Sequence, residues 1–367
     1  MNIFIDVRLC SYNYQGVKTY IENILPYLLS KKEYVFYLAG HEDFINKYKN
    51  YDNVKTIKFA APINSIKEQI LGFNIMRKYK KEIDVFFFPY PSVPISFFNT
   101  NFVVKLYDVT PFKFWYYFNP IKVLLGILVM KIIILKAKKI IVVSESTRKD
   151  LVQYFGMNSI KAVRIYGGVN EHFKKLDKEE VEKFMISKNL TKYVLFVGNR
   201  EKSKNIFRLI QAIRLLKDKG FDIQLLIIGR KFKAYEKIDK EILSFEEFVK
   251  IVYDVPNEDL VRYYNAAEIY VQPSLNEGFG LPVLEAMRCG CACAVSDIPV
   301  FREIFADTCL YFNPYSVEDI ANTLKKILTD EELKEKLRQK SIKHAEKFSW
   351  EITAKGVLNI FEQLKRS

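Results

Sequence analysis

The chain of 367 residues has little of what a metal site or a disulfide framework needs. It holds three histidines, which stand far apart, and five cysteines. Cys289, Cys291 and Cys293 alternate along the chain, which is typical of one face of an incoming strand and not of zinc ligands. An odd cysteine count favours reduced thiols and a cytoplasmic protein. We therefore expect no metal ion and no disulfide bond.

Long uninterrupted apolar runs are also missing. The most apolar stretch, residues 123–143, is interrupted by Lys131 and Lys136 and continues into a β-branched strand, so we do not expect it to span a bilayer. The first residues, MNIFIDVRLC, lack the basic and apolar segments of a signal peptide and are expected to form a first strand. Zinc-finger spacing, an RNP pattern and a recognisable helix-turn-helix are absent, so nucleic acid is not an expected partner.

What the chain does have is 49% hydrophobic residues, 15% aromatic residues and a net charge of +14. This composition is globular, and the length favours two domains of roughly 150 to 200 residues each. The positive charge comes mostly from lysines spread through the sequence. Such lysines form a solvated surface or, alternatively, draw the protein to polyanions or anionic lipid.

Short β-branched or aromatic runs alternate with amphipathic stretches, which predicts parallel βαβ units with right-handed crossovers. The rhythm lapses at Gly167 and Gly168 and in the charged run that follows, and it then restarts. The expected fold is therefore α/β, with two Rossmann-like, doubly wound parallel-sheet domains facing each other across a cleft. The predicted strands of the first half are Ile3–Val7, Val35–Ala39, Val54–Ile57, Val85–Phe88, Phe102–Leu106 and Ile140–Val143, and those of the second half are 193–198, 223–229, 269–273, 292–296 and 309–312.

These patterns divide the chain into an N-terminal domain, residues 1–172, and a C-terminal domain, residues 173–345. The last stretch, residues 346–367, has apolar residues at helical spacing and is expected to pack back toward the N-terminal domain.

Residues 271–290, VQPSLNEGFGLPVLEAMRCG, lead from a predicted strand into a helix that we expect to begin near Pro282. Gly278 and Gly280 permit close backbone approach, and the helix start offers unpaired amides, so this loop is suited to a diphosphate. Glu285 falls near the third helical position, where it either caps the helix or binds a ligand. Glu277 is either solvated surface or an acceptor for vicinal sugar hydroxyls.

Other polar residues stand at predicted strand ends. Arg200 and Lys204 lie in VGNREKSKNIFRLI, which is either an ordinary lysine-rich loop or a cationic site for a leaving diphosphate. Gly16 precedes a helix after the first strand. Tyr107 and Asp108 end another strand, and they are either residues of a site or a buried tyrosine and a helix-capping aspartate.

NEGFGLPVLEAMRCG resembles the E-x7-E signature of retaining glycosyltransferases with the GT-B fold, specifically glycosyltransferase family 4. The resemblance continues in NEDLVRYYNAAEIYVQPS before the motif and in SDIPVFREIFADTCLYFNP and FSWEITAKGVLNIF after it. In the first half it is looser, through QGVKTYIENIL, DVFFFPYPSVP, VVSESTRKDL and YGGVN. It thus covers nearly the whole chain.

The resemblance implies that the donor binds in the C-terminal domain, with Glu285 on the ribose and Glu277 on the sugar. It also implies that Lys204 binds the diphosphate; Arg200 is the less certain second cation, because Asn199 occupies the commonest position of the family arginine. Loop residues expected to receive sugar or phosphate are Gly278, Phe279, Gly280 and Leu281. Tyr107 stands where many family members have histidine, next to Asp108, and Gly16 is expected near the acceptor or its phosphate.

The implied activity is the metal-independent, retaining transfer of a hexose such as mannose, glucose or galactose. The donor is a nucleotide diphosphate sugar, and the acceptor is a saccharide or lipid-linked hydroxyl in bacterial polysaccharide, lipopolysaccharide or glycolipid synthesis. The same motif disfavours an epimerase or a phosphorylase. Because the histidine is replaced, a catalytically weak or silent protein that binds sugar nucleotides or membranes is the alternative. Residues 112–131, basic and aromatic, either belong to the core or rest on the anionic inner face of a membrane.

Overall fold

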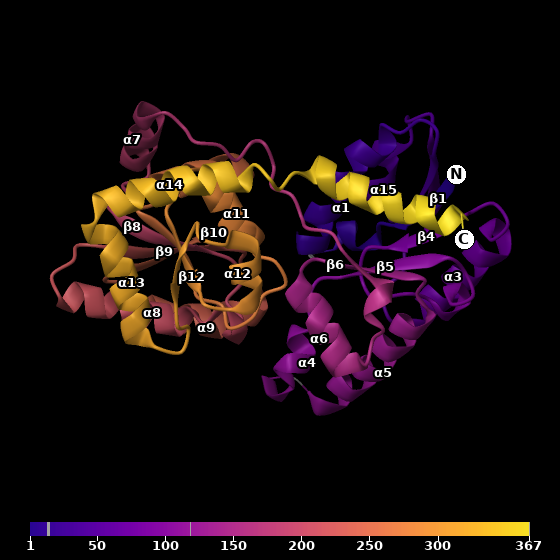
Figure 1. The fold of residues 1–367 in the computed structure, drawn as a ribbon, viewed down its shortest axis with the longest axis horizontal. Helices are drawn as coiled ribbons and strands as arrows, with labels where there is room; N and C mark the ends of the chain where they lie inside the picture. Colours follow the sequence, from indigo (N-terminus) through magenta and orange to yellow (C-terminus); the bar gives the residue numbers. More distant parts are fainter. Residues whose placement is uncertain (13–14, 118, 367) are drawn as a thin grey trace. The chain divides into compact units, whose positions relative to one another are not determined.

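The computed structural model describes residues 1–12, 15–117 and 119–366. The chain forms two compact units (Figure 1). Unit 1 contains Met1–Gly168 and the chain from Ser349 onward, and unit 2 contains Val169–Phe348. The boundary predicted after residue 172 thus lies four residues beyond the observed one. The last helix, α15 (Trp350–Arg366), belongs to unit 1, where it lies beside α1 (Gln15–Leu29).

Unit 1 is built on a seven-stranded sheet in which every pair of neighbouring strands is parallel, in the order β3-β2-β1-β4-β5-β6-β7. The strands are β1 (Asn2–Asp6), β2 (Val35–Gly40), β3 (Val54–Lys58), β4 (Val85–Phe88), β5 (Phe102–Leu106), β6 (Lys139–Val142) and β7 (Ala162–Arg164). The other α-helices of unit 1 are α2 (Glu42–Ile45), α3 (Ile66–Tyr79), α4 (Thr110–Lys113), α5 (Pro120–Lys136) and α6 (Glu145–Phe155).

Unit 2 has a six-stranded parallel sheet in the order β10-β9-β8-β11-β12-β13. Its strands are β8 (Tyr193–Val197), β9 (Gln224–Gly229), β10 (Val249–Tyr253), β11 (Ile269–Gln272), β12 (Cys293–Ser296) and β13 (Leu310–Phe312). Its helices are α7 (Lys178–Ser187), α8 (Ile206–Asp218), α9 (Glu236–Leu243), α10 (Asn257–Ala266), α11 (Leu281–Arg288), α12 (Pro299–Phe305), α13 (Val317–Thr329) and α14 (Glu331–Ala345).

The predicted pair of doubly wound parallel-sheet domains is confirmed, but the sequence patterns missed two strands. Both missed strands, β7 and β10, lie at the edge of a sheet. In β10 only Val249 is buried, and Lys250 is exposed. Because an edge strand needs less apolar surface than a central one, its sequence carries a weaker strand signal.

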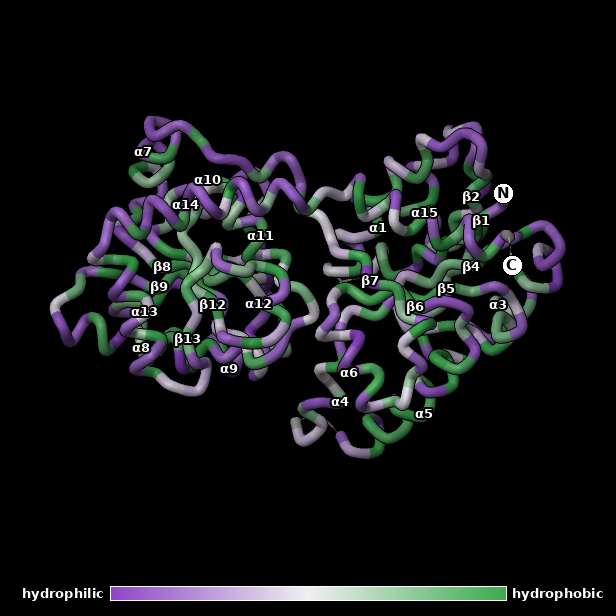
Figure 2. Tube along the Cα trace, in the orientation of Figure 1, coloured by the Kyte–Doolittle hydropathy of each residue, from purple (hydrophilic) through white to green (hydrophobic). Residues whose placement is uncertain are grey.

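Helix α5 is apolar on both sides. One side packs into the core of unit 1 through Met130, Ile133 and Ile134. Figure 2 shows hydrophobic residues along much of this helix. The exposed residues of the other side, with their exposed fractions, are Ile121 68%, Leu124 68%, Leu125 58%, Leu128 56%, Val129 46%, Ile132 37% and Leu135 71%. No helix in the described parts of the chain has the length and apolar character needed to cross a membrane.

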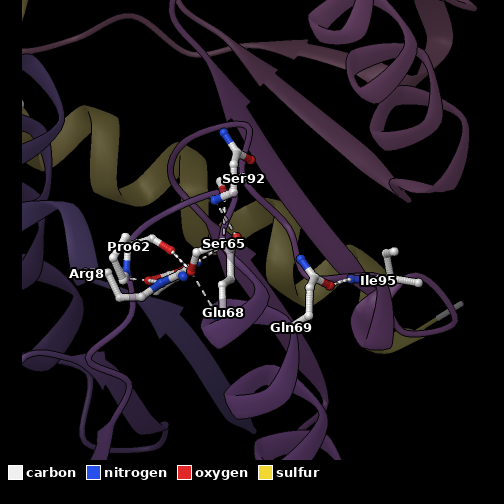
Figure 3. A network of polar contacts seen from close by, with 9 residues as sticks. Arg8, Pro62, Ser65, Glu68, Gln69, Ser92 and Ile95 are labelled. Carbon is white, nitrogen blue, oxygen red and sulfur yellow. Dashed lines mark hydrogen bonds and ion pairs between the residues drawn. The ribbon is translucent and has the colours of Figure 1, made fainter.

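An ion-pair triad is buried in unit 1 just after β1. The Arg8 guanidinium donates from NH2 to Asp6 Oδ2 at 2.7 Å and lies 2.7 Å from Glu68 Oε1 on α3. Figure 3 shows Arg8 and Glu68 together with Ser92, whose hydroxyl donates to Glu68 Oε1 at 2.8 Å. The guanidinium carbon also lies 3.9 Å from the centre of the Phe59 ring. The triad thus ties the end of β1 to α3 inside the core.

Candidate donor site and the strand-end residues of unit 1

Glu277 lies in the loop between β11 and α11, and its carboxylate accepts several hydrogen bonds on one oxygen. Lys204 Nζ donates to Oε1 at 2.7 Å, Ser274 Oγ at 2.8 Å and Gln272 Nε2 at 3.1 Å. Among the described residues no donor reaches Oε2 of Glu277. This arrangement fixes the carboxylate and leaves Oε2 to accept hydrogen bonds from a ligand.

A second layer of hydrogen bonds supports Glu277. Gln272 and Ser274 are buried, and Gln272 Nε2 donates to Ser274 Oγ at 2.9 Å. Tyr270 OH in turn donates to Gln272 Oε1 at 2.5 Å. Buried side chains that satisfy one another in this way lock a single rotamer of the carboxylate they hold. The sequence analysis missed Gln272 and Ser274, although a glutamine that ends the apolar strand IYVQ was a usable signal.

Lys204 reaches Glu277 because the loop after β8 is tied to the loop after β11, the neighbouring strand. Lys204 ends a short 3₁₀ helix, Lys202–Lys204, and Asn205 follows it with a left-handed φ of 60°. The Asn205 side-chain amide donates to Pro273 O at 3.0 Å, and the Leu275 N–H donates to Ser203 O at 2.8 Å. The carboxyl ends of adjacent parallel strands meet at one edge of the sheet, where ligands bind in such folds.

The start of α11 has the backbone geometry that the sequence predicted for anion binding. Gly280 has φ of +103°, and a Cβ there would lie 2.9 Å from both Phe301 and Phe305. In the described chain, the amides of Gly278, Gly280 and Leu281 donate no hydrogen bond. These amides, at the positive end of the helix dipole, are therefore available to an anion.

Phe279, the remaining residue of this loop, has its side chain turned into the protein. It is 7% exposed, and its ring lies edge-on to Phe348 with ring centres 6.0 Å apart. Its side chain therefore anchors the loop and is not suited to a ligand.

Glu285 does not cap α11, which corrects one of the two interpretations of this residue. It is the fifth residue of the helix, and the Tyr264 OH donates to its Oε2 at 2.9 Å. Burial raises the pKa of the Glu285 carboxyl to about 7, although the hydrogen bond from Tyr264 opposes the shift. Glu285 is partly buried. A partly buried carboxylate with one neutral partner is costly for folding and is suited to accept ribose hydroxyls.

We expect Glu285→Gln to be more stable than wild type at alkaline pH. Because folding raises the pKa of this carboxyl, the folded protein keeps its full stability below the pKa of the unfolded chain. That stability is lost as pH rises through about 7. The variant should therefore gain about 2 kcal/mol over wild type at about pH 8 and little at about pH 4.5. Urea unfolding of both proteins at the two pH values measures this. If the free energies of unfolding of wild type and Glu285→Gln depend on pH in the same way, burial does not destabilise the ionised Glu285 carboxylate.

Arg200, predicted to bind the diphosphate, lies in the core of unit 2. Its Nε donates to Asp239 Oδ1 at 2.7 Å and its NH2 to Asp239 Oδ2 at 3.1 Å. The guanidinium carbon lies 4.8 Å from the Tyr235 ring centre and 5.5 Å from that of Tyr253. The residue is 2% exposed. Arg200 is therefore a structural ion pair and is not placed to bind a phosphate, which leaves Lys204 as the predicted cation that fits.

In unit 1 the predicted residues stand at strand ends. Asp108 is exposed, and its Oδ1 accepts a hydrogen bond from the Thr110 N–H at 2.7 Å. The Tyr107 hydroxyl is buried and has no hydrogen-bond partner in the described chain. Gly16 is exposed in the first turn of α1, and an added Cβ would meet nothing within 4 Å. The backbone therefore does not require glycine at residue 16.

No group of three or more His, Cys, Asp and Glu side chains could hold a metal ion in residues 1–12, 15–117 and 119–366. All five cysteines are buried free thiols. Cys293 is the first residue of β12, and Cys289 and Cys291 precede it. The three cysteines therefore lead into a strand, as the sequence predicted.

The fold is that of the GT-B glycosyltransferases. The structure of the Anabaena protein HepE in complex with UDP-glucose matches with a TM-score of 0.77 and 16% identity, covering 99% of this chain and 100% of that chain. Residues 14–173 match the family described as Glycosyltransferase Family 4, and residues 177–344 match Glycosyl transferases group 1. The chain therefore belongs to the glycosyltransferases that join a family 4 domain to a group 1 domain.

Curated relatives of the chain include mannosyltransferases of Escherichia coli. The serotype-specific mannosyltransferase WbdA is 30% identical over 241 residues, which cover 63% of this chain and 29% of that protein. The O-antigen chain mannosyltransferase B is 28% identical over 240 residues, 62% of this chain and 61% of that protein. The match thus spans less than two thirds of either relative.

Proposed function

We propose that this protein is a retaining hexosyltransferase that moves a sugar from a nucleotide diphosphate donor to an acceptor hydroxyl. The observation that carries the proposal is the Glu277 and Lys204 pair, 2.7 Å apart, in the loops after β11 and β8. Departure of a nucleoside diphosphate develops negative charge on the β-phosphate. Lys204 and the free amides at the start of α11 supply positive charge there, and we therefore propose that no metal ion is required.

Glu277 is assigned to positioning of the donor sugar. Its Oε1 is held by Lys204, Ser274 and Gln272, and its Oε2 faces no donor in the described chain, so a vicinal sugar hydroxyl fits there. A retaining glycosidase would instead need two carboxyl groups straddling the bond. We propose attack on the same face as departure, with the leaving phosphate taking the proton of the acceptor hydroxyl. Glu285 binds the ribose in this scheme.

The acceptor is assigned to unit 1, beside Gly16, Tyr107 and Asp108. The mannosyltransferase relatives and the UDP-glucose complex of HepE support mannose or glucose as the transferred sugar. The relative named for the O-antigen chain supports a saccharide or lipid-linked acceptor in cell-surface polysaccharide synthesis.

The test is release of nucleoside diphosphate from a panel of nucleotide hexoses, with and without EDTA. The proposal predicts turnover of one or two donors, unchanged by EDTA, and strongly reduced in Glu277→Gln. Lys192→Met is the matched control. Lys192 is exposed and directly precedes the amino end of β8, whereas Lys204 follows its carboxyl end. If nucleotides bind but no nucleoside diphosphate is released with any acceptor extract, the protein binds sugar nucleotides without transferring the sugar, and the proposal fails.

We propose further that α5 rests on an anionic membrane surface, where a lipid-linked acceptor would lie. The outward side of α5 is apolar, as described above, and the exposed Lys122, Lys131 and Lys136 lie on the same helix. Trp115 and Tyr116, just before it, are 56% and 58% exposed. Apolar side chains flanked by lysines match an interface of acyl chains and anionic headgroups. The expectation that these aromatic residues belong to the core is wrong for Trp115 and Tyr116.

Leu124→Glu combined with Leu128→Glu is expected to lower partitioning to vesicles that contain anionic lipid by at least about tenfold. Co-sedimentation at low and high salt measures this. Ile186→Glu is the control, because Ile186 is an exposed apolar residue, 80% exposed, on α7 of unit 2. Equal recovery of wild type in the supernatant with and without anionic vesicles would remove the membrane proposal and leave the transferase proposal intact.

A further inference from the structure

Unit 1 holds a buried lysine with no counter-charge. Lys105 lies in β5, paired with Ile141 of β6, and is 1% exposed. In the described chain it makes no hydrogen bond and no ion pair. Its ammonium instead lies 4.1 Å from the ring centre of Tyr20 and 4.5 Å from that of Tyr107. Burial of an unpaired ammonium is costly, so the fold keeps Lys105 at an energetic penalty.

The polar groups around Lys105 also lack partners. The hydroxyls of Tyr20 and Tyr107 and the indole Nε1 of Trp350 are buried, and none has a hydrogen-bond partner in the described chain. The Tyr20 ring lies edge-on to both neighbours, with ring centres 6.2 Å from Tyr107 and 6.0 Å from Trp350. Hydrogen-bond donors from α1, the end of β5 and α15 therefore gather where the described chain supplies no acceptor.

Two of these residues lie just after strands of the sheet. Tyr107 directly follows β5, and Tyr20 lies in the second turn of α1, which follows β1, so both stand at the carboxyl edge of the sheet. Ligands bind at this edge in open parallel sheets. An ammonium, phenolic hydroxyls and an indole N–H can all donate hydrogen bonds, and the complement of such a set is an oxyanion.

We propose that Lys105, Tyr20, Tyr107 and Trp350, called the Lys105 cluster, bind an oxyanion of the acceptor substrate, a phosphate or a carboxylate. The assignment to the acceptor rests on the proposed function, which places the acceptor in unit 1. The cluster thus defines the acceptor as an anionic molecule.

Burial alone lowers the pKa of Lys105 to about 7. The titratable groups near it are Tyr20, Tyr107 and, next to Tyr107, Cys10, and burial raises the pKa of each of them well above neutral. Lys105 is therefore the group of this cluster whose charge changes between about pH 6 and 9. An oxyanion binds the protonated form, so its affinity falls as pH rises through this range.

The two tryptophans of the chain make the test direct. Trp115 is exposed and Trp350 is 4% exposed, so Trp115→Phe leaves Trp350 as the only indole reporter. Titration of this variant with sulfate, which keeps its charge across the range, is compared with chloride at matched ionic strength. We expect a saturable change in Trp350 emission, with an affinity at least about tenfold weaker at about pH 8.5 than at about pH 6.5.

In the Trp115→Phe background, Lys105→Met is expected to weaken sulfate binding at least about tenfold, and Tyr20→Phe, which removes only an unpartnered hydroxyl, about threefold. Lys67→Met, an exposed lysine of α3, should have no effect. Acetate binding tighter than sulfate would select a carboxylate over a phosphate. The proposal is overturned if neither anion gives a saturable change, or if Lys105→Met and Tyr20→Phe bind as the parent does. The readout needs no donor, so failed sugar transfer leaves it unaffected.

Discussion

Lys204→Met is expected to lower the rate of sugar transfer by about a hundred- to a thousandfold. The ammonium lies 2.7 Å from Glu277 Oε1, in the loop that leads into α11, where the leaving diphosphate is assigned. Removing one preoriented group that stabilises transition-state charge commonly costs about 3 to 4 kcal/mol. The loss should appear mainly in kcat, because the charge develops during bond cleavage. Initial rates over a range of donor concentrations measure both parameters.

The control for this variant is again Lys192→Met, which removes one lysine from the same unit at the amino end of β8. It should retain wild-type rates. A Lys204→Met enzyme with kcat within about threefold of wild type would show that Lys204 does not face the leaving group. The assignment of the diphosphate to this loop would then be wrong, whatever the activity of the wild type.

Arg8→Met is expected to destabilise unit 1 by about 3 to 5 kcal/mol. The guanidinium is fully buried between Asp6 and Glu68, each 2.7 Å from its NH2. Its removal leaves two buried carboxylates without their cation, and the surrounding core offers no substitute charge. Urea unfolding of unit 1, followed by Trp350 emission in the Trp115→Phe background, measures the free energy.

Arg77→Met is the matched control, because Arg77 is an exposed arginine on α3, the helix that carries Glu68. It should change the free energy of unfolding by less than about 0.5 kcal/mol. A loss below about 1 kcal/mol in Arg8→Met would show that the triad contributes little net stability and that the carboxylates take up protons instead.

Much of the donor site could be predicted from the sequence, because parallel sheets place successive strand ends at one edge. Glu277 and Lys204 are 73 residues apart in the chain, yet they meet because β11 and β8 are neighbours. The direction of a side chain within such a loop is harder to predict. Arg200 lies four residues before Lys204, and only the position of Asp239, on α9, shows that Arg200 points into the core.

The Lys105 cluster shows a second limit. A lysine inside the apolar run VVKLY was visible in the sequence, but its surroundings depend on α1 and α15, and Trp350 is 245 residues further along the chain. Glu285 shows a third limit, since a small shift in the start of α11 decides between a capping residue and a carboxylate facing Tyr264. Local patterns therefore located the strand ends, and tertiary packing decided the role of each residue there.

The measurement that tests the central claim most directly is calorimetric titration of nucleoside diphosphates into wild type, Lys204→Met and Glu285→Gln at about pH 8, where Glu285 is ionised. The account predicts that one nucleoside diphosphate binds to wild type without a metal ion. Both variants should bind it at least about tenfold more weakly, although Glu285→Gln is the more stable protein. Equal affinity in all three proteins, or no binding of any nucleoside diphosphate to wild type, would contradict a donor site at Glu277, Lys204 and Glu285.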